Sequence, residues 1–137
     1  MTENKKILIV DDEAGFTRVL KIALEKAGPY VVETENNGLR AVQTALNFKP
    51  DIIFLDVVMP EIDGGDVASQ IRAVPALAKI PIVFITAIVS PNETGRSENA
   101  IGGFTFLSKP VSLETLIRHI NHHTNPPPGS HGPKGLG

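Results

Sequence analysis

The chain of 137 residues contains no cysteine and no tryptophan. Without cysteine, the protein has no disulfide framework, no thiolate metal ligand and no cysteine nucleophile. It also lacks any apolar run near the roughly 20 residues that cross a membrane, and its first residues do not form the apolar stretch of a signal peptide. These absences predict a cytoplasmic protein that does not bind membranes.

A strong charge of either sign is absent as well. The net charge is −2, with 13 basic and 15 acidic side chains. This balance gives no electrostatic reason to expect binding to nucleic acid. Hydrophobic residues make up 42% of the chain and charged residues 20%, which is the composition of a chain that folds. The length fits one domain.

Short apolar runs alternate with helical periodicity along the chain. Most of the runs are too brief for helices and lack the alternation of half-buried strands, which indicates strands buried on both faces. Strands are predicted at 7–10, 30–34, 52–55, 80–86 and 104–107, and helices at 13–27, 39–48, 66–73, 91–100 and 113–122.

The predicted helices differ in how clearly they are specified. The helix at 13–27 has an apolar stripe that includes Val19, and the helix at 39–48 should bury Leu39. The segment 91–100 has no strong apolar stripe.

Alternation of strand and helix five times predicts an α/β fold with a parallel sheet covered on both faces. The folded domain should span residues 1–123. A Pro- and Gly-rich segment at 124–137 has almost nothing to bury, and we expect a disordered tail or the start of a linker there.

Polar side chains stand where the predicted strands end. Asp11 and Asp12 follow the first strand, Asp56 the third and Thr86 ends the fourth, while Lys109 comes just after the fifth. Because the carboxyl ends of parallel strands share one edge of the sheet, these residues should converge on one crevice.

Three carboxylates in one crevice repel one another. Two of them about 4 Å apart repel by roughly 4 kcal/mol at an effective dielectric constant near 20. A hard divalent cation such as Mg²⁺ removes this repulsion and prefers oxygen ligands. The ammonium of Lys109 and the hydroxyl of Thr86 would remain to bind a second anionic group, and a phosphoryl group suits them.

With these residues, the chain resembles a response-regulator receiver domain of the CheY-like, single-domain form. The resemblance covers about residues 5–122. Each matching fragment is weak evidence alone, but their occurrence together, in order and at the strand ends, is highly specific. The matching fragments are Asp11-Asp12, Leu55-Asp56-Val57-Val58-Met59-Pro60, Asp63-Gly64, Thr86-Ala87 and Phe106-Leu107-Ser108-Lys109-Pro110.

The resemblance implies a (βα)5 doubly wound, flavodoxin-like fold with strand order 2-1-3-4-5. It implies that Asp56 accepts a phosphoryl group from a phosphohistidine on a sensor histidine kinase or phosphotransfer protein. Asp12, Asp56 and the main-chain carbonyl of Val58 would ligate Mg²⁺ (or Mn²⁺), and Asp11 would act on the ion mainly through water. Lys109 would pair with the phosphoryl oxygens.

A conformational switch is implied in the same way. Thr86 would move toward the phosphoryl group, and Phe106 would turn inward. The surface that changes would combine the helix at 91–100, the strand at 104–107 and the helix at 113–122, and it would bind a downstream protein. The resemblance also implies a cis peptide bond before Pro110. The protein would assist its own phosphorylation and dephosphorylation, without being an enzyme for an outside substrate.

Two positions are expected to tune the lifetime of the phosphoryl group. Val58 lies two residues after Asp56, and Ile88 lies two after Thr86. Both side chains are apolar and cannot orient a hydrolytic water, so we expect slow self-dephosphorylation.

Other functions can be weighed against this one. A phosphatase of the haloacid dehalogenase type would need an acid where Val58 stands. A fragment of a larger regulator with a DNA-binding or enzymatic output domain remains open, as does a receiver that acts without phosphorylation. His119, His122 and His123 have the spacing of a helical metal site, but such residues more often form an exposed polar helix end.

Overall fold

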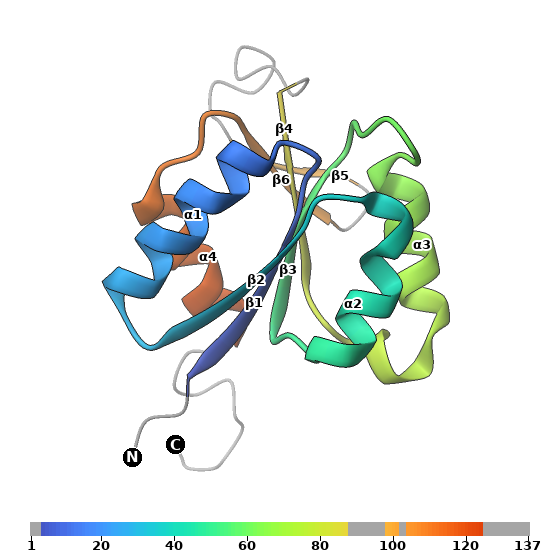
Figure 1. The fold of residues 1–137 in the computed structure, drawn as a ribbon, viewed down its shortest axis with the longest axis horizontal. Helices are drawn as coiled ribbons and strands as arrows, with labels where there is room; N and C mark the ends of the chain where they lie inside the picture. Colours follow the sequence, from blue (N-terminus) through green and yellow to red (C-terminus); the bar gives the residue numbers. More distant parts are fainter. Residues whose placement is uncertain (1–3, 88–97, 102–103, 125–137) are drawn as a thin grey trace.

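The computed structural model describes residues 4–87, 98–101 and 104–124. In the described part of the chain, six strands form one sheet with the order β2-β1-β3-β4-β6-β5 (Figure 1). The strands are β1 (Lys5–Val10), β2 (Tyr30–Glu35), β3 (Ile52–Asp56), β4 (Ile82–Thr86), β5 (Glu98–Ile101) and β6 (Phe104–Ser108).

Helices cover both faces of this sheet. Figure 1 shows α1 and α4 on one face and α2 and α3 on the other. None of the helices in the described segments has the length and hydropathy needed to cross a membrane. The helices are α1 (Ala14–Ala27), α2 (Ala41–Phe48), α3 (Gly64–Ala73) and α4 (Leu113–Thr124), with short 3-10 turns η1 (Gly38–Arg40) and η2 (Pro75–Leu77).

The predicted doubly wound fold is confirmed. The strands β2, β1, β3, β4 and β6 run parallel to one another, in the predicted order. The predicted tail at 124–137 lies outside the described residues, apart from Thr124, the last residue of α4.

The predicted helix at 91–100 is wrong where the structure can be compared with it. Residues 98–100 belong to β5, which pairs antiparallel with β6, and 91–97 lie outside the described residues. A segment without an apolar stripe gains little from packing as a helix on the sheet. Pairing along β6 instead satisfies main-chain hydrogen-bonding groups.

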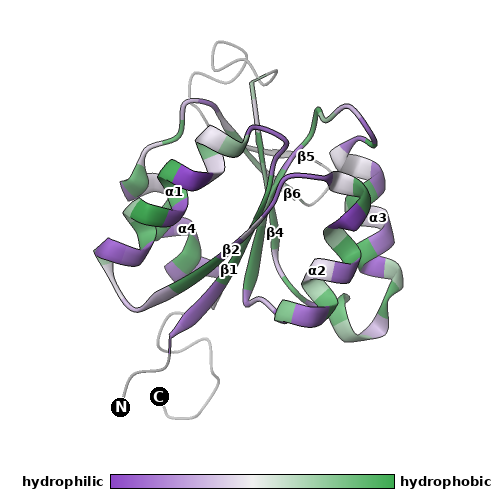
Figure 2. Ribbon diagram, viewed as in Figure 1, coloured by the Kyte–Doolittle hydropathy of each residue, from purple (hydrophilic) through white to green (hydrophobic). Residues whose placement is uncertain are grey.

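The sheet separates two apolar cores because successive strand side chains point to opposite faces. In β3, Ile53 and Leu55 pack on the side of α2 and α3, whereas Ile52 and Phe54 pack on the side of α1 and α4. All four side chains are fully buried. Figure 2 shows the apolar strands between the two helical layers. This two-sided burial explains why the strands read as continuous apolar runs.

Two large side chains in the predicted apolar stripes are exposed. Leu39 is 62% exposed. It lies in the turn η1, before α2 begins, so the periodicity of α2 does not determine which way its side chain faces. Val19 in α1 is 64% exposed, and Thr17 is buried instead. The Thr17 hydroxyl donates to the carbonyl of Ala14 and accepts from the side chain of Asn36, which makes its burial possible.

The edge strand β2 receives side-chain hydrogen bonds from α1. Lys21 Nζ donates to the carbonyl of Val32 at 2.6 Å, and the carboxylate of Glu25 accepts from the N–H of Val32 at 3.0 Å. Lys21 and Glu25 also form an ion pair at 3.1 Å. The hydrogen bond from Val32 and the one from Lys21 lower the pKa of Glu25. One i, i+4 pair therefore satisfies both main-chain groups of a strand residue.

Candidate functional site

The fold places the predicted site residues at the carboxyl end of the parallel strands. Asp11 and Asp12 follow β1, while Asp56 and Thr86 are the last residues of β3 and β4. The sheet order reverses between β1 and β3, and open α/β sheets place their ligand sites at this switch point. Lys109 follows β6, and its N–H donates to the carbonyl of Thr86 at 3.1 Å.

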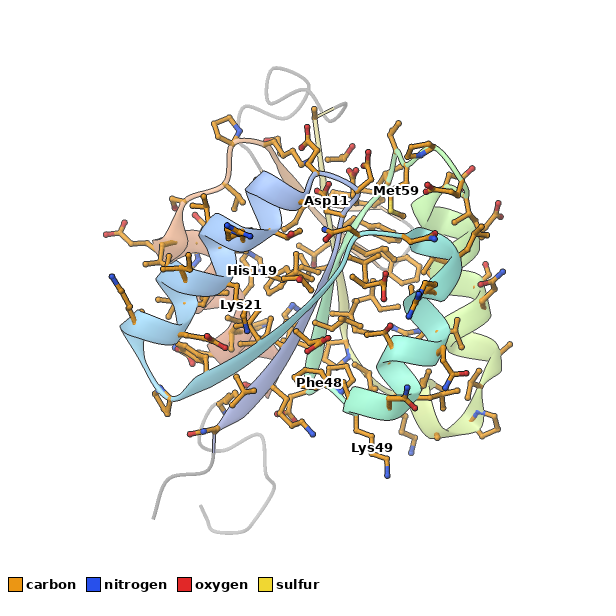
Figure 3. The ribbon with its side chains drawn as sticks, viewed as in Figure 1. Asp11, Lys21, Phe48, Lys49, Met59 and His119 are labelled. Atoms are coloured by element: carbon orange, nitrogen blue, oxygen red, sulfur yellow. The ribbon has the colours of Figure 1, made fainter. Side chains whose placement is uncertain are left out.

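A cavity of about 270 Å³ opens at this end of the sheet. Asp56 forms part of its wall with only 5% of its surface exposed, and Thr86 is 1% exposed. Asp11 is also 1% exposed and is not among the lining residues, and Figure 3 shows it at the same end of the sheet. The lining residues are Asp12, Glu13, Asp56, Val58, Thr86, Ala87 and Lys109.

The three aspartates form a cluster that could bind a cation. Asp11, Asp12 and Asp56 each offer one carboxylate oxygen, and these oxygens lie within 4.8 Å of one another. The Oδ2 atom of Asp11 is buried and faces the ammonium of Lys109, 2.8 Å away. A cluster of three carboxylates, which offers only oxygen ligands, fits a hard divalent cation such as Mg²⁺.

The electrostatics of the cluster act on Asp56. Burial raises the pKa of Asp56 to about 6, and the neighbouring charges of Asp11 and Asp12 add to this rise. Lys109 and the N–H of Val58, which donates to the Asp56 carboxylate, oppose it. The folded protein therefore holds an ionised Asp56 at neutral pH only at a cost in stability.

Lys109 is surrounded by acidic groups. Its Nζ lies 2.8 Å from Asp11 Oδ2, 2.9 Å from Glu13 Oε1 and 4.0 Å from Asp56 Oδ1. Burial acts to lower the pKa of Lys109, but the ion pairs with Asp11 and Glu13 outweigh it and raise the pKa. Lys109 therefore stays protonated beside Asp56.

The loop after β3 is held by main-chain contacts. The N–H of Gly64 donates to the carbonyl of Val57 at 2.7 Å, and Asp63 caps the first turn of α3 by accepting from the N–H of Asp66. A side chain at Gly64 would collide with the carbonyl oxygen of Asp56. The peptide bond between Lys109 and Pro110 is cis.

The remaining predicted site residues are Val58, Ile88 and Phe106. Val58 is 55% exposed and lines the cavity, while Ile88 lies outside the described residues. Phe106 is half-buried and stacks on Phe84, with the ring centroids 4.9 Å apart. The Phe106 side chain therefore already contacts the core in this structure.

The histidines of α4 form the exposed polar end that the sequence indicated only in part, because His122 is exposed but His119 is buried and His123 is half-buried. His119 is 9% exposed and lies on the side of α1, as Figure 3 shows, and its ring stacks on that of His123. Burial and the neighbouring histidines lower the pKa of His123. Within the described residues, the only acid or histidine cluster with the spacing of a metal site is the aspartate trio.

Sequence reasoning missed two residues of this site, Glu13 and Phe16. Glu13 lines the cavity and binds Lys109, and the Lys109 ammonium lies 4.6 Å from the centroid of the Phe16 ring. Glu13 could have been suspected because it follows the acidic pair Asp11 and Asp12 directly. Phe16 reads as part of the apolar stripe of α1, so the sequence holds no signal for its contact with Lys109.

Fold and site together define a doubly wound α/β domain with an acidic cavity at the switch point. Comparison with known proteins agrees. Residues 7–121 match the response regulator receiver domain family. The chain therefore belongs to this family, and the predicted resemblance is confirmed.

Individual relatives point the same way. The chain is 31% identical over 120 residues to the DNA-binding dual master transcriptional regulator RpaA of Synechocystis, an alignment that covers 84% of this chain and 47% of RpaA. It is 43% identical over 84 residues to the alkaline phosphatase synthesis transcriptional regulatory protein PhoP of Bacillus subtilis, covering 61% of this chain and 34% of PhoP. The chain thus spans about half the length, or less, of these curated relatives.

A solved structure shares the fold over most of its length. The chemotaxis protein CheY4 of Vibrio cholerae superposes with a TM-score of 0.73 at 30% identity, covering 88% of this chain and 98% of CheY4. The chain is thus a receiver domain of the kind found in two-component response regulators, which are signalling proteins.

Proposed function

We propose that Asp56 accepts a phosphoryl group from a phosphohistidine of a sensor histidine kinase or phosphotransfer protein. The observation that carries the proposal is the Asp56 carboxylate in the cavity wall, with an ammonium 4.0 Å from its Oδ1 atom. One carboxylate oxygen forms a bond to phosphorus while the bond from phosphorus to the donor nitrogen breaks. The electron pair of that bond leaves with the imidazole, which then takes a proton.

The neighbouring residues have separate roles in this step. Lys109 pairs with the phosphoryl oxygens, and the Thr86 hydroxyl donates a hydrogen bond to one of them. Asp12, Asp56 and the carbonyl of Val58 hold Mg²⁺ or Mn²⁺, and Asp11 acts on the ion mainly through water. When bound, the cation neutralises charge on the phosphoryl oxygens and on the carboxylates.

Phosphorylation is proposed to switch a protein-binding surface. The phosphoryl group carries a charge of about −1.5 to −2 and would stand beside Thr86, at the end of β4. Movement of Thr86 would free space for the half-buried Phe106 to turn further inward, and full burial of such a ring contributes about 1.5–3 kcal/mol. The affected surface comprises β6, α4 and the segment before β6, and its partner is a downstream protein.

The wider setting is part of the same proposal. The receiver domain spans residues 1–123, residues 124–137 serve as a tail or linker, and the protein acts in the cytoplasm without binding membranes or, by itself, nucleic acid. RpaA and PhoP are named as transcriptional regulators, and the alignments cover only 47% and 34% of their lengths. A DNA-binding output domain beyond this receiver is therefore the second candidate setting.

Phosphodonor labelling tests the role of Asp56. Incubation with acetyl phosphate and Mg²⁺ should add one phosphoryl group to the protein, measured as intact mass, and chelation of the cation should prevent it. Asp56→Asn should abolish labelling. Asp51→Asn is the matched control, because Asp51 lies just before the other end of β3 and is exposed. Labelling that persists in Asp56→Asn, or that is absent from the wild type, would overturn the proposal.

The lifetime of the phosphoryl group should depend on Val58. An amide at this position could orient the attacking water, and one added hydrogen bond corresponds to about five- to tenfold in rate. Val58→Asn should therefore accelerate loss of the label by about that factor relative to the slow wild type. The exposed Val19 provides the same substitution far from the cavity, and Val19→Asn should leave the decay unchanged. Decay of the wild-type label within seconds would contradict the expectation.

A further inference from the structure

Lys109 does not make its closest contacts with Asp56. Its Nζ is 2.9 Å from Glu13 Oε1 and 2.8 Å from Asp11 Oδ2, but 4.0 Å from the nearest Asp56 oxygen. The ring of Phe16 lies against the ammonium on another side, with its centroid 4.6 Å away. Three of the four groups around Lys109 thus belong to the stretch from Asp11 to Phe16.

We propose that Glu13 is a positioning residue that holds Lys109 away from Asp56 until a phosphoryl group arrives. On phosphorylation, Lys109 exchanges Glu13 for the phosphoryl oxygens. The inference rests on the proposed function, because it contrasts two positions of Lys109. In the resting position, before phosphorylation, Lys109 binds Glu13, and after phosphorylation it binds the phosphoryl oxygens.

The local backbone leaves Glu13 available for this contact. Glu13 precedes the first residue of α1, and its side chain makes no capping hydrogen bond to the helix. Its N–H donates to Asp11 Oδ1 at 2.9 Å, which holds the start of α1 against the end of β1. The Glu13 side chain can therefore accept a hydrogen bond from Lys109, a residue 96 positions away in sequence that also lines the cavity.

The exposure of the two partners favours the exchange. The Glu13 side chain is 61% exposed and that of Lys109 is 16% exposed, so solvent weakens this ion pair. A phosphoryl group on Asp56 carries more charge and several acceptor oxygens, and it would stand next to the ammonium. Glu13 therefore delays the engagement of Lys109 without preventing it.

Asp11 has a different part in this arrangement. It is buried, and its Oδ1 and Oδ2 atoms face the N–H of Glu13 and the ammonium of Lys109. This contact keeps Lys109 at the site when Glu13 is released. Glu13 is the partner that can be exchanged, and Asp11 is the one that stays.

The resting position can be tested by NMR of the metal-free, unphosphorylated protein. The Phe16 ring should shift the Lys109 ε-methylene protons upfield, since the ammonium lies over its face. Glu13→Gln should move these signals toward ordinary lysine values, and loading the wild type with beryllofluoride and Mg²⁺ should do the same. Signals unaffected by Glu13→Gln would overturn the inference.

Phosphorylation kinetics provide the second test. Glu13→Gln should increase the rate of labelling by acetyl phosphate about two- to fivefold, the range for a weak exposed ion pair. Glu13→Asp keeps the charge but shortens the side chain, and it should also increase the rate. Glu61→Gln removes the same charge from an exposed residue outside the cavity lining and should not.

The variants separate the possible explanations. Acceleration by Glu13→Gln without acceleration by Glu13→Asp would mean that Glu13 only repels the anionic donor, and it would overturn the inference. Equal acceleration by Glu61→Gln would do so as well. A wild type that acquires no phosphoryl group would refute the proposed function, whereas the metal-free spectra would still decide whether Glu13 holds Lys109.

Discussion

Replacement of Asp56 by asparagine is expected to stabilise the folded protein by about 3 kcal/mol at pH 7.5 in the absence of divalent cations. In the folded state, burial and the charge of Asp11 raise the pKa of Asp56 from 3.8 to about 6. The carboxylate is 5% exposed, so solvent screens it little. Asparagine has nearly the same shape and carries no charge, and it removes this penalty.

The sign of the pH dependence follows from the same shift. Between pH 3.8 and about 6 the folded protein binds the Asp56 proton and the unfolded chain does not. The Asp56 contribution therefore lowers the free energy of unfolding as pH rises through this range, and the penalty is constant above it. Below pH 3.8 both states are protonated at Asp56, and the stabilities of Asp56→Asn and wild type should converge.

Urea unfolding at pH 4 and pH 7.5 measures this difference. The quantity to compare is the stability of Asp56→Asn minus that of the wild type, since other acids titrate in both proteins. Asp51→Asn should show no gain at pH 7.5, because Asp51 is exposed and accepts a hydrogen bond from the N–H of Lys6. Addition of Mg²⁺ should raise the free energy of unfolding of the wild type and remove most of its difference from Asp56→Asn. A variant less stable than the wild type at pH 7.5 would contradict the prediction.

Gly64→Ala is expected to destabilise the protein by about 2–3 kcal/mol and to weaken Mg²⁺ binding. A Cβ atom at this position would collide with the carbonyl oxygen of Asp56 and would lie 2.8 Å from the Cα of Val57. Both obstacles are main-chain atoms, which cannot rotate away as a side chain could. The strand end that carries Asp56 would have to shift.

Gly65→Ala is the matched control for this substitution. The nearest atom to a Cβ at Gly65 is Asp63 Oδ1 at 3.6 Å, an ordinary contact. Because Gly65 lies within α3, alanine there should stabilise the protein by about 0.5–1 kcal/mol. Urea unfolding and calorimetric titration with Mg²⁺ measure both effects. Equal stability of the two alanine variants would show that the close approach at Gly64 is not restrictive.

The parts of the fold that were predictable are those with strong local signals. The runs that became β1 and β3 are apolar because both faces of the sheet are covered, and their ends fixed the positions of Asp11 and Asp56. The parallel arrangement then implied that these residues converge. A buried strand and its final residue can therefore be read from sequence without knowledge of the packing.

The errors came from features that depend on packing or pairing. Leu39 fits the periodicity of α2 but lies in a 3-10 turn with a different phase. The segment that contains β5 had been predicted as helix, although Gly102-Gly103 between two short segments is a hairpin signal. Glu13 reaches Lys109 only because the fold brings residues 96 positions apart together, and no local pattern reports such a contact.

The hydrogen bonds from α1 to β2 bear on self-association. An edge strand with free main-chain groups is a template on which a strand of another chain can pair, and such pairing leads to polymers. At Val32 both groups are already bonded to Lys21 and Glu25, so an incoming strand would have to displace an ion pair. Pairing with another chain is thereby opposed at the middle of β2, so helix α1 protects part of the sheet edge as well as covering one face.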